Sequence, residues 1–206
     1  MVVTTAKPQP DRILDAALAC IARVGVDKTT LDDVAREAGC GRATVYRCFP
    51  GRQRLFRALL DREVQTLAQR VIDAAGRSDT LADAIAAVML TAAEAFRTHP
   101  ALVFVLAHEP ELVTPQLSFE RGSALLVTAA ALAAPAFERF LAHDRAERLA
   151  EWVARLTLTY LCNPSDDGHL DDPTWVRALI ADYVLPGVTR TVNAFASTSA
   201  REGAAL

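Results

Sequence analysis

Apolar residues recur every three to four positions along most of the chain, the spacing that places them on one face of an α-helix. Where this period runs and where Gly, Pro or polar clusters interrupt it, the pattern predicts helices at 11–24, 52–75, 81–98, 101–108, 119–141, 144–162 and 173–191. Pro135 is expected to kink or end the helix that contains it. No segment combines strand alternation with turn residues, so we predict an all-α chain.

Two further short helices are predicted within residues 29–56. Thr29 and Thr30, followed by Asp32 and Asp33, form a helix-capping pattern, and Gly39 is a residue that commonly ends a helix. After a short turn, a second helix at 42–49 must stop near Pro50. Two short helices joined by a tight turn make a helix-turn-helix, whose second helix can lie in the major groove of DNA.

The second short helix separates apolar and polar positions. Val45 and Phe49 fall on one side, where they would pack on the first helix, and Arg47 points the opposite way. Ala43 and Thr44 flank it, while Arg42 and Tyr46 lie one turn apart along one edge. Guanidinium groups suit guanine edges, methyl-sized groups suit thymine, and hydroxyls suit phosphates. An ordinary surface helix would show the same pattern.

The charge distribution favours the DNA interpretation. The formal net charge is -3, but residues 1–60 carry ten basic and six acidic residues, while the remainder carries twelve and nineteen. Six arginines fall between Arg36 and Arg57, against one acid, Glu37. Local basic charge on an acidic chain indicates a polyanion contact at one end. Lys7 and Lys28 are the only lysines, so the arginines can also reflect a general use of arginine in place of lysine throughout this chain.

At these residues the chain resembles the TetR family of bacterial transcription regulators. The positions that match the family's DNA-binding motif are Thr30, Val34, Ala35, Ala38, Gly39, Thr44, Tyr46, Phe49 and Leu55, with Ala43, Val45 and Arg52 as close replacements. The departures are Cys40, Gly41, Cys48 and Gly51. Cys48 replaces a common aromatic residue, which puts one phosphate contact in doubt. The motif covers about a quarter of the chain.

The resemblance implies a homodimeric repressor that a small molecule releases from a palindromic operator of double-stranded DNA. We expect a flexible arm at 1–10, a DNA-binding domain at 11–57, a ligand-binding and dimerisation domain at 58–196, and a flexible tail at 197–206. The residues predicted to bind DNA are Thr30, Arg42, Ala43, Thr44, Tyr46, Arg47 and Arg52.

The last two predicted helices each carry a wide apolar face. Such faces can simply cover the core, but the resemblance implies a four-helix dimer interface, and a two-fold operator calls for a dimer. The predicted interface residues are Leu149, Trp152, Val153, Leu156, Val176, Ile180, Tyr183 and Val184.

The resemblance also implies a ligand cavity between the middle helices. The predicted lining is Val88, Ala92, Phe96, Val103, Leu106, Phe119, Leu126 and Tyr160. These residues can equally form a filled core. So few polar side chains fall near them that an apolar effector is favoured. A shift of the long helix at 52–75, near Leu67 and Val71, would then move the DNA-binding end as a lever.

Other classes of function find little support. The chain lacks G-x-S-x-G, H-E-x-x-H and glycine-rich phosphate-binding motifs, so we do not expect an enzyme, and we predict neither a cofactor nor a metal. The four cysteines show no metal or disulfide spacing, and thiol sensing near the DNA face is the minor alternative. Neither a signal peptide nor a transmembrane run is apparent, so no membrane contact and a cytoplasmic location are expected. A DNA-binding protein without a ligand, or an activator, stays open.

Overall fold

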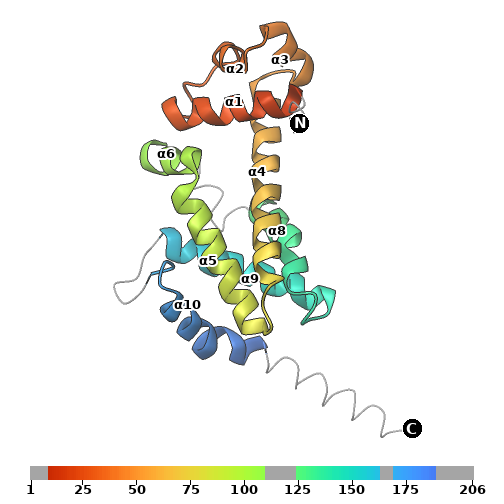
Figure 1. Ribbon diagram of the computed structural model, residues 1–206, viewed down its shortest axis with the longest axis vertical. Helices are drawn as coiled ribbons and strands as arrows, with labels where there is room; N and C mark the ends of the chain where they lie inside the picture. Colours follow the sequence, from red (N-terminus) through yellow and green to blue (C-terminus); the bar gives the residue numbers. More distant parts are fainter. Residues whose placement is uncertain (1–8, 110–123, 163–168, 189–206) are drawn as a thin grey trace, which may run out of the picture. The chain divides into compact units, whose positions relative to one another are not determined.

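The computed structural model describes residues 9–109, 124–162 and 169–188, and every regular element in these ranges is helical (Figure 1). The helices are α1 Gln9–Val24, α2 Leu31–Glu37, α3 Arg42–Cys48, α4 Arg52–Ala75, α5 Leu81–Thr98, α6 Pro100–His108, α8 Ala124–Ala133, α9 His143–Cys162 and α10 Pro173–Leu179. The all-α prediction is confirmed.

The chain divides into two compact units, each built from two pieces of sequence. The first comprises residues 1–67 and 95–125, and the second comprises residues 68–94 and 126–206. Helices α4 and α5 therefore contribute to both units. The compact unit that contains the expected 11–57 domain thus extends along α4 and also includes α6.

The core of the first unit is centred on α1. Its inward face packs against α2, against Val45 of α3 and against Leu55 and Leu59 of α4. Helix α1 begins at Gln9, two residues before the predicted start, so Gln9 and Pro10 form its first turn rather than part of an arm. A proline fits there because the first N–H groups of a helix have no partner within the helix.

Helix α6 belongs to the same core. Ala101 and Val105 are buried among the residues of α1 and α2. Pro100 occupies the first turn of α6, and the imidazole Nδ1 of His99 accepts a hydrogen bond from the Leu102 N–H at 3.2 Å, which caps the helix.

The core of the second unit contains the inner faces of α5, α9 and α10. Its fully buried side chains include Ile85, Met89, Phe137, Val153, Val176 and Ile180. Aromatic rings of α9 and α10 also meet, with the Tyr160 and Trp175 centroids 5.0 Å apart in an edge-to-face arrangement.

Two predicted helices differ from the structure. The helix predicted at 119–141 is seen as α8, which ends at Ala133 and continues as a 3-10 turn at Ala134–Ala136, so the helix ends next to Pro135 as expected and the apolar period beyond it does not extend it. Residues 119–123 lie outside the described residues. The predicted helix from Pro173 contains a π-helical turn at Ile180–Val184, and its last residues, 189–191, are not described.

Candidate nucleic-acid interface

Helix α2 is fixed at its start by a reciprocal cap. The Asp33 N–H donates to Thr30 Oγ1 at 3.2 Å, and the Thr30 N–H donates to Asp33 Oδ2 at 3.3 Å. The Thr30 hydroxyl also donates to Asp33 Oδ2, and this hydrogen bond, followed by the one from the Thr30 N–H, lowers the pKa of the Asp33 carboxyl, with a smaller contribution from Arg36. The hydroxyl of Thr30, one of the predicted DNA contacts, is therefore already engaged in capping its own helix.

Helix α3 follows a tight turn and shows two unlike faces. Gly39 has a φ of +61°, in the left-handed region that favours glycine at a helix end. Val45 is fully buried against α1 and α2, and Phe49 packs partly against the same core. Thr44 is half-buried, while Ala43 and Arg47 are exposed. The orientation expected from the 100° helical period is therefore the one observed.

Arg47 is free on the outer face of α3. No hydrogen bond or ion pair engages its guanidinium within the part of the chain that the structure describes. Its donors are consequently available to a base edge or a phosphate oxygen without first breaking a contact within the protein.

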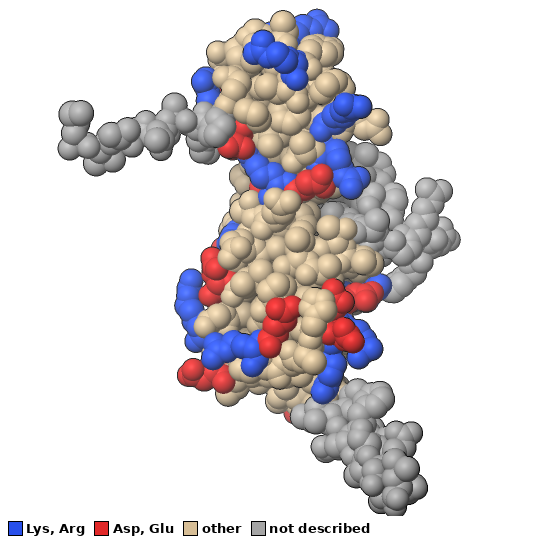
Figure 2. All heavy atoms as spheres, turned by 90° about the vertical axis from the view of Figure 1, so that its right-hand side faces the viewer, with Lys and Arg blue, Asp and Glu red and all other residues tan. Residues whose placement is uncertain are grey.

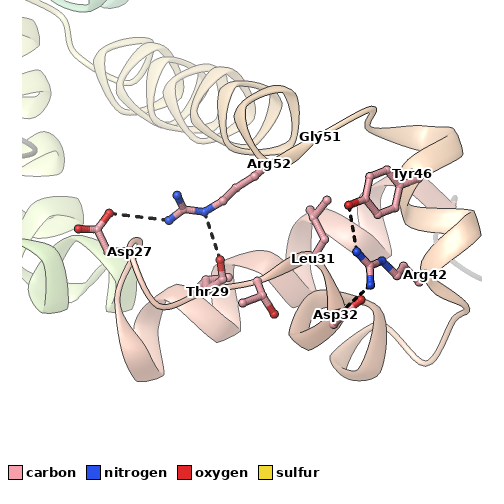
Figure 3. A pocket seen from close by; sticks show the side chains of 9 residues that line it. Asp27, Thr29, Leu31, Asp32, Arg42, Tyr46, Gly51 and Arg52 are labelled. Atoms are coloured by element: carbon pink, nitrogen blue, oxygen red, sulfur yellow. Dashed lines mark hydrogen bonds and ion pairs between the residues drawn. The ribbon is translucent and has the colours of Figure 1, made fainter.

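Arg42 is held along the edge of the same helix. Its guanidinium lies 3.0 Å from Asp32 Oδ2 and donates to the Tyr46 hydroxyl at 3.3 Å (Figure 3). The Cζ atom of Arg42 also lies 5.4 Å from the centroid of the Tyr46 ring. Asp32 belongs to the first turn of α2, so this pair links the two helices. An exposed ion pair of this kind contributes little to stability, so a phosphate can compete for Arg42 at low cost.

Arg52 has a role that the sequence did not predict. Its Nε donates to the Thr29 carbonyl at 3.2 Å, and Asp27 lies 3.8 Å from its Nη2 (Figure 3). The same Nη2 donates to the Val26 carbonyl. Arg52 therefore ties the start of α4 to the turn between α1 and α2. Its side chain is still 43% exposed, which leaves it within reach of a DNA backbone.

A shallow hollow of about 370 Å³ opens beside these residues. Four of the seven predicted DNA contacts line it, namely Thr30, Arg42, Tyr46 and Arg52. Arg42 and Arg52 lie on different sides of it and come from α3 and α4 (Figure 3). Ala43, Thr44 and Arg47 do not border it, so the predicted set divides into a group around the hollow and a group on α3 beside it.

Basic side chains are abundant on the surface of the first unit. On the face seen in Figure 2, the part that carries α2 and α3 shows mainly basic side chains, whereas acidic and basic side chains mix over the second unit. Arg54, in the first turn of α4, is exposed and makes no described ion pair or hydrogen bond. Arg54 is one of the six arginines of the basic cluster between Arg36 and Arg57, but it is not among the residues predicted to bind DNA. Its lack of an internal partner makes it a further candidate phosphate contact.

The described cysteines do not form a cluster with a known chemistry. Cys20 is fully buried, and that burial raises the pKa of its thiol, which makes it a poor nucleophile. Cys40 and Cys48 are half-buried free thiols, Cys40 in the turn before α3 and Cys48 at the last residue of α3. Within the described ranges, no group of His, Cys, Asp and Glu side chains is arranged to hold a metal ion. None of the described helices is long and apolar enough to cross a membrane.

The residues predicted to line a ligand cavity fall in both units. Val88 is buried in the second unit, where Ala92, Leu126 and Tyr160 are half-buried; in the first unit Phe96 is half-buried and Val103 is exposed. Phe119 lies outside the described residues, and the side chain of Leu106 is not described. None of the six whose side chains are described borders the hollow beside α3 or a second open hollow, of about 320 Å³, near Arg77 and Arg177. The cavity stays a prediction.

The residues predicted to form a dimer interface divide by exposure. Five are buried within the single chain, namely Leu149, Val153, Val176, Ile180 and Val184, and Leu156 is half-buried. Trp152 and Tyr183 are 61% and 76% exposed, which is unusual for large aromatic side chains. Trp152 lies on α9, and Tyr183 lies in the π-helical turn that follows α10.

Comparison with known proteins agrees with this geometry. Residues 13–59 match the family model described as "Bacterial regulatory proteins, tetR family". An uncharacterized HTH-type transcriptional regulator of Mycobacterium tuberculosis is 31% identical over 182 residues, which span 87% of this chain and 85% of the relative.

Solved structures share the fold at lower identity. The TetR family repressor AlkX of a Dietzia strain, implicated in biodegradation of n-alkanes, superposes with a TM-score of 0.66 at 19% identity, covering 89% of this chain and 96% of its own. The regulator FadR of Bacillus subtilis, solved with stearoyl-CoA, gives a TM-score of 0.52 at 16% identity over 84% and 98% of the two chains. The helix-turn-helix exposes Arg47, residues 13–59 match the family model, and the Mycobacterium tuberculosis regulator matches most of both chains. The chain therefore belongs to the TetR family of transcriptional regulators, which bind DNA through an N-terminal helix-turn-helix domain.

Proposed function

We propose that the chain is a homodimeric repressor that acts in the cytoplasm, binds a palindromic operator through α3, and is released by a small apolar molecule. The observation that carries the DNA contact is the outer face of α3. Val45 anchors one face of the helix in the core, while the opposite face presents Arg47, which has no partner among the described residues, beside Ala43.

The individual roles follow from chemistry and position. Arg47 offers a guanidinium fork to a base edge in the major groove, and Ala43 offers a methyl group to thymine. Arg42, Tyr46 and Arg52 surround the hollow and supply donors to backbone phosphates, which position the protein without reading sequence. Thr44 contributes a hydroxyl to the same backbone, and Thr30 does so by exchanging the hydrogen bond of its hydroxyl to Asp33 for one to a phosphate oxygen.

A dimer is proposed because one short helix reads too few base pairs for a specific site. Helix α3 has seven residues, and helix-turn-helix proteins overcome this limit by placing two copies on half-sites one turn of DNA apart. The exposed Trp152 and Tyr183 supply aromatic anchors of the kind enriched at protein interfaces.

The effector is proposed to be apolar because the predicted lining residues are almost entirely apolar. Support from the fold is limited to the observation that FadR, a protein of the same fold, was solved with stearoyl-CoA. A regulator without a ligand, or an activator, has the same DNA-binding surface and is distinguished only by experiment.

The test is a gel-shift series with operator DNA taken from the sequence upstream of the gene and its neighbours. We expect Arg47→Ala to weaken specific binding by about 1 to 3 kcal/mol, and to relax discrimination at one base position. Arg70→Ala serves as the control, because it removes the same charge from an exposed position on the second half of α4. Equal affinities of the Arg47→Ala and Arg70→Ala proteins would contradict the proposed orientation of α3.

A further inference from the structure

Glu109 is the residue that follows α6, and its carboxylate reaches the turn between α1 and α2. Glu109 Oε2 accepts a hydrogen bond from the Val26 N–H at 2.7 Å, and Oε1 accepts one from the Asp27 N–H at 3.3 Å. The residue is only 9% exposed. A buried carboxylate is tolerated when charge-assisted hydrogen bonds replace its water, and here two backbone amides 82 and 83 residues away do so.

The turn is shaped to receive this side chain. Gly25 has a φ of +89°, which favours glycine, and there is no room for a larger residue. A Cβ atom at Gly25 would clash with the carboxylate of Glu109 and would lie 2.9 Å from Cε1 of Phe104 in α6. The end of α6 and the turn at 25–29 are therefore in direct contact.

The other side of the same turn is held by Arg52. The guanidinium of Arg52 donates to the carbonyl of Thr29 (Figure 3) and to that of Val26. Val26 is therefore bonded through its N–H to Glu109 and through its C=O to Arg52. Within the turn, the buried hydroxyl of Thr29 donates to the Gly25 carbonyl at 2.6 Å. The next residue, Thr30, caps α2.

We propose that Glu109 is a positioning residue for DNA binding, which acts by fixing the turn at 25–29. With the turn fixed, the Val26 and Thr29 carbonyls hold Arg52 at the edge of the hollow, and Thr30 sets the start of α2. Movement of the end of α6 withdraws the carboxylate and leaves two amides without acceptors. The inference rests on the proposed use of Thr30, Arg42 and Arg52 as phosphate contacts, and it makes α6 part of the DNA-binding apparatus.

The direct experiment compares Glu109→Gln with Glu138→Gln, which makes the same charge change at an exposed site of the second unit. The amide that replaces the carboxylate presents an N–H₂ group to one of the two backbone donors. We expect faster hydrogen exchange at Val26 and Asp27, and operator affinity lower by about tenfold, the factor that corresponds to about 1.4 kcal/mol. Helix content by circular dichroism stays unchanged, and the Glu138→Gln protein behaves as wild type.

A double-mutant cycle separates positioning from general stability. If Glu109 acts through the turn that Arg52 shares, Glu109→Gln costs less operator affinity in an Arg52→Ala background than in the wild type. The two losses add if the residues act independently, and additivity overturns the proposal. Faster exchange at the turn with unchanged operator affinity also overturns it.

A measurement on the unaltered protein keeps the inference testable if Glu109→Gln fails to fold. Hydrogen exchange of residues 25–29 is recorded with and without operator DNA, and we expect slower exchange in the complex. Equal rates would show that DNA binding does not engage the turn, which contradicts the proposal. If Arg47→Ala weakens operator binding and Glu109→Gln does not, this inference is wrong but the proposed function is still supported.

Discussion

At the scale of single residues, Glu63 lies between two bases in the first unit. Its carboxylate accepts hydrogen bonds from Arg62 at 2.8 Å and from His99 Nε2 at 3.3 Å, and Arg62 also pairs with Asp15 of α1 at 2.8 Å. The other nitrogen of His99 accepts the Leu102 N–H, which assigns the proton to Nε2. A polar chain thus connects α1, α4 and the start of α6.

The pKa of Glu63 is lowered, chiefly by the hydrogen bond from His99 and secondarily by Arg62. A lowered carboxyl pKa stabilises the folded state above the ordinary value of 4.5, and this contribution disappears as the pH falls through the folded-state pKa. We expect Glu63→Gln to reduce the free energy of unfolding at pH 7 by about 1 kcal/mol, allowing for solvent screening. Urea unfolding of both proteins between pH 3 and 7 measures it. A difference that does not shrink at low pH would show that packing, not charge, is responsible.

Which residue contacts could be predicted depends on their separation along the chain. The buried Val45, the exposed Arg47 and the cap between Thr30 and Asp33 follow from local period and spacing, and these predictions match the structure. The contacts of Arg52 with Val26 and of Glu109 with the same residue span 26 and 83 positions. No local pattern reports such pairs, because they depend on how α4 and α6 pack on α1.

At the scale of helices, a proline, as expected, and a π-helical turn explain where the structure departs from a continuous apolar period. Pro135 lacks the N–H that a helix interior requires, and α8 gives way to a 3-10 turn at Ala134 although the apolar period continues beyond it. After α10, the Leu185 N–H bonds to the Ile180 carbonyl five residues earlier. The added residue per turn rotates the later side chains away from the 100° pattern. Ile180 and Val184 are both buried by this arrangement.

The proposed dimer predicts opposite outcomes for two substitutions, one on α9 and one in the π-helical turn after α10. Trp152→Asp alters a side chain that is exposed in the single chain, so we expect a folded monomer by analytical ultracentrifugation. Ile180→Asp places a charge in the core of the second unit, which costs several kcal/mol, so we expect loss of helical signal. A Trp152→Asp protein that sediments as a dimer would move the interface away from this face of α9.

At the scale of the whole molecule, the two units differ from the domains expected from the sequence because each is discontinuous. A boundary at 57/58 follows from where the recognised motif ends, whereas compactness depends on contacts between distant segments, such as those of Ala101 and Val105 with α1. A reading of the chain in order cannot reveal that residues 95–109 return to the first unit.

The proposed switch makes a prediction for the intact protein. Linkage requires that an effector which weakens operator binding by some factor binds the operator complex more weakly than the free protein by the same factor. We therefore expect apolar effectors to raise the melting temperature of the free protein and to raise it less when operator is present. A thermal-shift screen with and without operator measures both. Compounds that stabilise the two forms equally, across a broad apolar panel, would favour a regulator without an effector.

The shared core of α1 and α6 also bears on how biosensors are assembled from regulators of this kind. A chimera that grafts a new promoter specificity onto an existing effector domain with a single crossover after residue 59 or 67 would separate Val26 and Asp27 from their acceptor, Glu109. It would also replace Ala101 and Val105 under α1 with unrelated side chains. A transplant that takes 9–67 together with 95–109 preserves both contacts. For this chain, the transferable module is therefore two segments of sequence, with one junction inside α4, one inside α5 and a third after Glu109.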